Sequence, residues 1–189
     1  MIETPRIRAA FQPLLCVALL AAAGSSLVAS PGPDGLCGAL LAALMVAVAA
    51  QDFRRYIIPN ELTAAAVALG LLRAGTVGPD ADWTAVLHAV LRAVAIMVPL
   101  LALMTGYRRW RGRDGLGLGD VKLAAVAGVW LGLATIFAVI EVAALSALAA
   151  YLIASKARNR PLKATAFLPF GVFLAPAIWL GWLVEALLG

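Results

Sequence analysis

Long apolar stretches separated by short polar segments dominate the chain. A helix that crosses about 30 Å of hydrocarbon needs about 20 residues. The stretches contain too many Ala, Leu and Gly, and too little alternation of apolar and polar residues, for a membrane β-barrel. The pattern predicts seven transmembrane helices, at about residues 9–29, 36–51, 60–77, 83–106, 120–131, 133–155 and 167–188.

Prolines, glycines and polar residues mark the breaks between these helices. Two prolines and two glycines in residues 30–35 cannot continue a helix. Pro59 disfavours helical geometry at the residue before it, and Asn60 is a good N-cap for the helix that follows. No repeat or linker divides the chain. We therefore expect a single transmembrane domain over residues 1–189, with a core at about 36–189 and an additional N-terminal helix at about 9–29.

The composition excludes a soluble domain. Of the residues, 63% are hydrophobic and 13% are charged, and the mean hydropathy is +0.97, whereas a soluble domain is about half apolar and a quarter charged. The expected fold is an all-α polytopic helical bundle in a lipid bilayer. The first apolar run resembles a signal peptide in its flanking residues but is too long for one, so we expect a retained helix. Cys16 and Cys37 lie in apolar runs and are expected to be buried or lipid-facing.

Basic residues are distributed unevenly between the polar segments. Apart from Arg73 and Arg92, every Lys and Arg lies near the N-terminus or at every second break between the expected helices. The alternate breaks contain Asp34, Asp80 and Asp82 and no basic residue. By the positive-inside rule, the N-terminus and the basic segments lie in the cytoplasm. The net charge of +5 is thus a topology signal, and nucleic acid is not an expected partner.

Two aspartates lie at the cytoplasmic ends of expected helices. Asp52 ends the second helix, and Asp120 begins the fifth. An acid at a membrane boundary is costly unless it is solvated or paired. Either aspartate alone is as consistent with a helix end as with function, but two on one membrane face favour a site. Two adjacent carboxylates share one proton. One can accept a proton from water while the other donates to a peptide carbonyl.

Local sequence around the pair suggests how it is supported. Gly117 and Gly119 allow backbone turns and close approach of a substrate. Helix dipoles favour a negative charge at Asp120, at a helix N-terminus, and disfavour it at Asp52, at a helix C-terminus. We therefore hypothesise that Asp120 is the ionised partner at rest and that Asp52 holds the proton, although Arg54 and Arg55 can reverse this order.

Three segments give a more specific signal. They are DFRRYIIPN at residues 52–60, GLGDVK at 117–122 and LPFGVFLAP at 168–176. In this order they resemble the type IV prepilin peptidases, which are membrane aspartyl proteases of the GxGD type. The resemblance implies that Asp52 and Asp120 are the catalytic pair. It also implies supporting roles for a set of nearby residues, with Lys122 orienting or tuning Asp120: Gly117, Gly119, Lys122, Pro59 and Asn60.

The same resemblance implies a substrate and a location. The expected activity removes the short basic leader of a prepilin or pseudopilin at the cytoplasmic face of the bacterial inner membrane. No metal or other cofactor is expected, and the pilus assembly machinery is a possible partner. The chain lacks the paired Cys-x-x-Cys ligands of the larger members' methyltransferase domain, so it resembles the short form associated with Flp/Tad pili. It departs from the family at Val172, where Pro-Phe-Gly is often followed by proline.

Other interpretations of the sequence remain open. The two alternatives from other classes are a small ion-coupled transporter and a non-catalytic pilus assembly factor. Arg92 and Glu141, at similar depth in two helices, are expected either to form a structural ion pair or to contact water and lipid separately. His88 is expected to be a packed or interfacial residue rather than a metal ligand. The tryptophans lie near helix ends, as interfacial anchors do: Trp83, Trp110, Trp130, Trp179 and Trp182.

Overall fold

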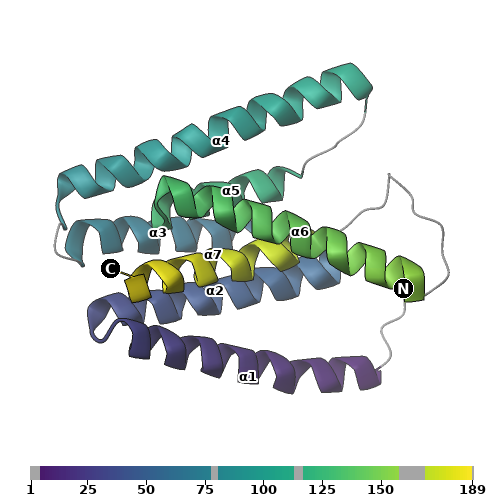
Figure 1. Cartoon of the computed structure of the whole chain (residues 1–189), viewed down its shortest axis with the longest axis horizontal. Helices are drawn as coiled ribbons and strands as arrows, with labels where there is room; N and C mark the ends of the chain where they lie inside the picture. The colour runs from purple at the N-terminus through teal and green to yellow at the C-terminus, as the bar shows by residue number, and fades with distance from the viewer. Residues whose placement is uncertain (1–4, 78–80, 113–116, 158–168, 189) are drawn as a thin grey trace.

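The chain folds into an all-α bundle of roughly parallel and antiparallel helices (Figure 1). The computed structural model describes residues 5–77, 81–112, 117–157 and 169–188. Within these ranges the expected all-α, seven-helix arrangement is confirmed. The helices are α1 (Pro5–Ala29), α2 (Pro33–Arg55), α3 (Asn60–Thr76), α4 (Trp83–Arg111), α5 (Leu118–Trp130), α6 (Leu133–Ala157) and α7 (Gly171–Leu188).

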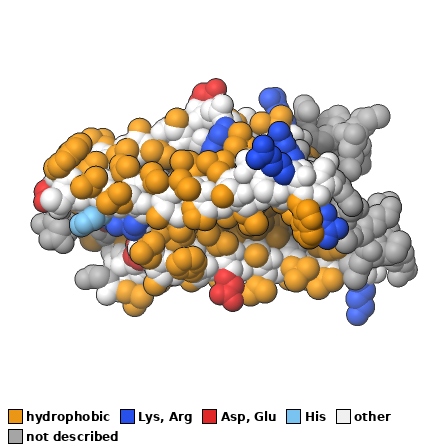
Figure 2. Space-filling model, turned by 90° about the horizontal axis from the view of Figure 1, so that it is seen from above, with side chains coloured by type: hydrophobic (Ala, Val, Ile, Leu, Met, Phe, Trp, Pro, Cys, Tyr) orange, Lys and Arg blue, Asp and Glu red, His pale blue; other side chains and the backbone are white. Residues whose placement is uncertain are grey.

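The apolar surface identifies the bundle as a polytopic membrane protein. Among the described helices, α2, α4, α6 and α7 are long and apolar enough to cross a membrane. The apolar part of α1, Leu15–Ala29, is shorter, and α3 and α5 have 17 and 13 residues. Hydrophobic side chains cover most of the face in Figure 2, and most of the Lys and Arg side chains seen there gather toward one end.

Successive helices run in opposite directions (Figure 1). The C-terminal ends of α2, α4 and α6 therefore lie at the same end of the bundle as the N-terminal ends of α3, α5 and α7. Several residues of the charge pattern have no described side chain: Arg6, Arg8, Asp80, Arg113, Arg158, Arg160 and Lys163. That all seven helices cross the membrane stays a prediction.

Several expected helix boundaries were wrong. Helix α2 begins at Pro33, inside the expected break at residues 30–35, because proline is tolerated in the first turn of a helix, and it continues to Arg55, four residues past its expected end at residue 51. Helix α4 continues to Arg111, about one and a half turns past its expected end at residue 106, because Tyr107 and the arginines after it are compatible with helix. Helix α7 begins at Gly171, after the Pro169 that disfavours an earlier start; residues 167 and 168 of the expected span lie outside the described part. Asn60 is the first residue of α3 rather than its cap, since Pro59 occupies the N-cap position.

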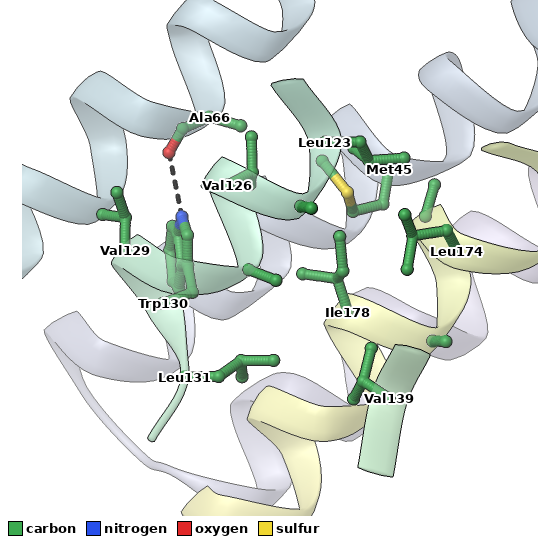
Figure 3. Packing of buried hydrophobic residues seen from close by; sticks show 14 of the residues in the cluster. Met45, Ala66, Leu123, Val126, Val129, Trp130, Leu131, Val139, Leu174 and Ile178 are labelled. Atoms are coloured by element: carbon green, nitrogen blue, oxygen red, sulfur yellow. Dashed lines mark hydrogen bonds between the residues drawn. The ribbon is translucent and has the colours of Figure 1, made fainter. Parts of the chain in front are cut away.

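The core lies where α2, α5 and α7 meet. Helix α2 packs against α1, α3 and α7, and α5 packs against α3, α4 and α7. Figure 3 shows Met45 of α2, Leu123 of α5, and Leu174 and Ile178 of α7 among these buried contacts. This packing fixes the α2 C-terminus near the α5 and α7 N-termini.

Two tryptophans belong to this core rather than to the membrane interface. Trp130 is 2% exposed and Trp182 is 1% exposed, so the expectation that they are interfacial anchors was wrong. The Trp130 indole N–H donates to the Ala66 carbonyl at 2.8 Å (Figure 3). A Cβ atom at Gly70 would lie 2.6 Å from the Trp130 indole nitrogen. The absence of a side chain at Gly70 therefore lets α3 accept this ring.

Charged side chains within the helices have partners that the sequence did not indicate. Arg73 of α3 forms an ion pair with Asp34 of α2, and its guanidinium lies 5.7 Å from the centre of the Trp130 ring. Arg92 donates to the Gly128 carbonyl at 3.2 Å, and Glu141 is exposed on α6. The predicted Arg92–Glu141 pair was therefore wrong, because α5 provides the acceptor for Arg92.

The Asp34–Arg73 pair gives a stability prediction. We expect Arg73→Met to lower the free energy of unfolding by about 1–3 kcal/mol, between the values for exposed and buried pairs, since it leaves Asp34 half-buried without its cation. Unfolding in detergent micelles measures this change. The double variant Asp34→Asn/Arg73→Met should lose less free energy of unfolding than the two single variants lose in sum. If the losses were additive, the ion pair would contribute nothing to stability.

Candidate active site

Asp52 lies in the last turn of α2 and is 5% exposed. The helix ends at Arg55, and its C-cap, Tyr56, adopts a left-handed conformation with φ 55° and donates its N–H to the Asp52 carbonyl at 2.9 Å. A short irregular segment then leads to Pro59, the extended N-cap of α3. The Ile57-Ile58-Pro59 segment therefore turns back beside the Asp52 side chain.

Asp120 lies in the first turn of α5. Gly117 is the N-cap of that helix, and its carbonyl accepts the Asp120 N–H at 3.1 Å. A backbone hydrogen bond from Gly117 also reaches the Asp120 carboxyl group. A Cβ atom at Gly117 would lie 3.0 Å from Asp120 Oδ2, which is closer than most side chains tolerate. Gly117 thus leaves room for the carboxyl group to fold back over the helix end.

The two carboxyl groups come from helices far apart in sequence and interact electrostatically. Ile58, 8% exposed, packs between the start of α5, which carries Asp120, and the start of α7. A Cβ atom at Gly119 would lie 3.1 Å from Ile58 Cβ, and one at Gly171 would lie 2.9 Å from Ile58 Cδ1. The Ile58 side chain therefore sets the spacing between the start of α5 and the start of α7.

The N-terminus of α7 meets the Asp52 carboxyl group. The Val172 N–H donates to Asp52 Oδ2 at 3.1 Å, and Gly171 also contributes a backbone hydrogen bond. The positive end of a helix dipole thus acts on Asp52 as well as on Asp120. The hypothesis that Asp120 is the ionised partner considered only the helix to which each aspartate belongs. Helix dipoles therefore do not indicate which of the two aspartates is ionised at rest.

Lys122 has a different partner from the expected one. Its ammonium group donates to the Asn60 side-chain oxygen, which joins α5 to the first residue of α3. This bond holds the Ile58-Pro59-Asn60 segment against α5, two residues beyond Asp120. Lys122 thus joins two segments that surround the aspartates, and its expected influence on Asp120 stays a prediction.

This contact gives a prediction about activity. We expect Lys122→Met and Asn60→Leu each to lower the rate of the reaction catalysed at this site by about three- to tenfold, because the segment that carries Ile58 loses its attachment to α5. The double variant should be no worse than either single variant, since the pair acts as a unit. Kinetics in detergent or liposomes measure all three variants, and multiplicative losses would argue against the attachment.

The arrangement is suited to acid–base chemistry on water. Among the residues that the structure describes, no group of three His, Cys, Asp or Glu side chains is placed to hold a metal ion. His88 is exposed near the start of α4. Two carboxyl groups that share a proton can act as base and acid in the same reaction. The site lies at the end of the bundle where Arg54 and Arg55 of α2 and the last turn of α4 are found.

Comparison with known proteins agrees with this geometry. The profile of the type IV leader peptidase family matches residues 39–155, which include Asp52 and Asp120. The chain belongs to the type IV leader peptidase family. Curated proteins named prepilin leader peptidase/N-methyltransferase are similar over most of the chain, and no solved structure matches it.

Three such relatives show the extent of the similarity. The Burkholderia pseudomallei protein is 35% identical over 84% of this chain and 47% of its own length. The Dickeya chrysanthemi protein is 34% identical over 82% of this chain and 53% of its own, and the Xanthomonas campestris protein 31% over 78% and 50%. The chain spans about half the length of the curated relatives it matches.

Sequence reasoning did not identify three residues of the site. Ile58, Gly171 and Val172 contact the aspartates or the backbone next to them. The segments that resemble the family contain all three, so the signal was present, but only the fold shows that residues 171 and 172 meet Asp52. The Pro-Phe-Gly segment lies beyond the matched residues 39–155 and is nevertheless part of the site.

Proposed function

We propose that this protein is a membrane-embedded aspartic endopeptidase that removes the short leader of type IV prepilins or pseudopilins. The observation that carries the proposal is the meeting of Asp52 and Asp120 in a chain of the type IV leader peptidase family. Several relatives are named prepilin leader peptidases. This chain resembles the short form of the family that is associated with Flp/Tad pili, and this resemblance favours a prepilin of the Flp type.

In the proposed mechanism, the two carboxyl groups hold one proton between them. The ionised group accepts a proton from water while the oxygen of that water attacks the scissile carbonyl carbon. The protonated group donates its proton to the carbonyl oxygen. Collapse of the resulting tetrahedral diol breaks the C–N bond: the amine leaves with a proton from the first carboxyl group, and the second, now ionised, carboxyl group takes a proton from a diol hydroxyl, so that the pair again holds one proton. The products are a leader with a new carboxyl terminus and a pilin with a new amino terminus.

Placement in the bilayer follows from the same elements. We place the Asp52–Asp120 end of the bundle at the cytoplasmic face of the inner membrane, with the N-terminus inside, because arginines gather at the helix ends beside the site. This position suits a basic leader, which stays on the side where the prepilin is made. The transporter alternative is less well supported, since the two acids lie at the helix ends rather than midway along them.

The test is cleavage of a defined substrate. The wild-type protein and a Flp-type prepilin are co-expressed in a host without its own leader peptidase, and the pilin is analysed by mass spectrometry. We expect loss of the leader at one bond, which leaves a single new N-terminus on the pilin. A prepilin with an unaltered leader, at normal levels of both proteins, would overturn the proposal.

A reporter fusion tests the orientation independently. With the N-terminus inside and seven crossings, alkaline phosphatase joined after residue 189 should be active, because it folds only in the periplasm. The same reporter placed after residue 112 should be inactive. The opposite pattern would place the aspartates at the outer face.

A further inference from the structure

The start of α7 is built around the Asp52 carboxyl group. A Cβ atom at Gly171 would lie 2.8 Å from Asp52 Oδ2 and 3.1 Å from its Cγ. Real Cβ atoms essentially never approach to 2.8 Å, so either the carboxyl group or the helix would have to move. Gly171 is buried, and its φ needs no glycine. The space taken by Asp52, not backbone conformation, therefore requires a glycine here.

The next residue supplies a donor in the same direction. The Val172 N–H lies 3.1 Å from Asp52 Oδ2 and 3.3 Å from the Pro169 carbonyl. Backbone amides in the first turn of a helix have no partner within the helix, so Asp52 satisfies one of them. In the related peptidases the Pro-Phe-Gly segment is often followed by proline at this position, and proline has no N–H to donate. The bond is thus available to this chain because position 172 is valine.

We propose that Gly171 and Val172 are positioning residues for Asp52: the glycine leaves the space and the amide fixes the carboxylate orientation. The inference deepens the proposed function and rests on it. Asp52 lies in the last turn of α2, which ends at Arg55, so only three residues of its own helix follow it. Ile58, the other side chain next to the Gly171 position, is apolar. Helix α7 therefore supplies the polar contacts that orient a buried carboxylate.

The first test uses two glycines of the same helix. A Cβ atom at Gly181 would meet Val139 Cγ2 at 2.6 Å, so Gly181→Ala disturbs the packing of α7 far from Asp52. We expect Gly171→Ala to lower kcat for leader cleavage by about 10- to 100-fold with KM within about twofold. Gly181→Ala should leave kcat per folded molecule unchanged. Equal losses in the two variants, or full activity of Gly171→Ala, would overturn the inference.

The second test removes the Val172 N–H, which contacts both Asp52 Oδ2 and the Pro169 carbonyl. Val172 is the second residue of α7, where proline is compatible with a helix. We expect Val172→Pro to lower kcat about tenfold relative to Val172→Ala, which keeps the N–H and also loses the valine side chain. Equal kcat in these two variants would show that the amide does not position Asp52, even if Gly171→Ala failed to fold.

The outcomes also separate this inference from the proposed function. All variants are compared with wild-type protein on the same prepilin in liposomes, and protein amounts are measured in each. Absence of cleavage by the wild type would refute the peptidase proposal. If the wild type cleaves the prepilin and the α7 variants cleave it at the same rate, only the positioning role is refuted.

Discussion

Replacing either Asp52 or Asp120 by asparagine is expected to abolish leader cleavage. Asparagine has nearly the same shape and can accept the Val172 amide bond, so the bundle should accumulate normally. It can neither accept a proton from water nor donate one to a carbonyl oxygen. Loss of one general acid–base group costs about 10²–10⁴-fold in rate. The measurement is single-turnover cleavage of a purified prepilin in liposomes.

The matched control for these variants is Asp82→Asn. Asp82 caps α4 and accepts the Ala85 N–H at 2.8 Å, at the other end of the bundle from the proposed catalytic pair. Asparagine is an equally good cap, so cleavage should continue at the wild-type rate. The double variant Asp52→Asn/Asp120→Asn should be no slower than either single variant, because the pair acts as one unit. Residual cleavage above 10% in one single variant would remove that aspartate from the mechanism.

Gly128→Ala is expected to cause a large loss of stability. A Cβ atom there would lie 2.5 Å from Ala93 Cα and 2.8 Å from Ala93 N. These are backbone atoms, which cannot rotate away, so α4 and α5 would have to separate. Small residues allow such close approach between membrane helices, and overpacking costs about 1–3 kcal/mol or more. We expect the free energy of unfolding in detergent micelles to fall by at least that amount.

A glycine in open space provides the comparison. A Cβ atom at Gly106, also in α4, would meet nothing within 4 Å. Gly106→Ala should leave stability unchanged or raise it by about 0.5–1 kcal/mol, since alanine favours helix. If Gly128→Ala were as stable as Gly106→Ala, the close contact between α4 and α5 would be refuted.

Helix positions were predictable because each break in the chain has a local chemical cause. The Pro-Gly segment after α1 and Pro59 before α3 end helices whatever the rest of the fold does. The end of α4 was not predictable, since Arg108 and Arg109 continue a helix as readily as they form a loop. Hydropathy alone places the end of a helix where the charged residues begin, but α4 continues through its arginines to Arg111.

Residues that meet across the bundle were harder to foresee. Asp52 and Asp120 could be placed at one membrane face by topology alone, and that was sufficient to suggest a site. Their neighbours depend on which helices pack together. The α7 amide at Asp52, the Gly128 carbonyl at Arg92 and the Ala66 carbonyl at Trp130 are backbone partners. Every residue except proline carries the same backbone donor and acceptor, so sequence gives little signal for such pairs.

The length of α5 has a consequence for the surrounding lipid. Its 13 residues give a helix about 20 Å long, whereas the hydrocarbon layer is about 30 Å thick. Helix α6 starts at Leu133, and the Gly132 N–H just before it is satisfied by the Glu185 carboxyl group at 2.8 Å. On the expectation that α5 crosses the membrane, acyl chains beside this hairpin shorten or tilt to meet it. A bilayer deformed in this way would bring headgroups and water nearer to Asp120 than a flat membrane would. Bilayer thickness is thus part of the environment that this short helix specifies.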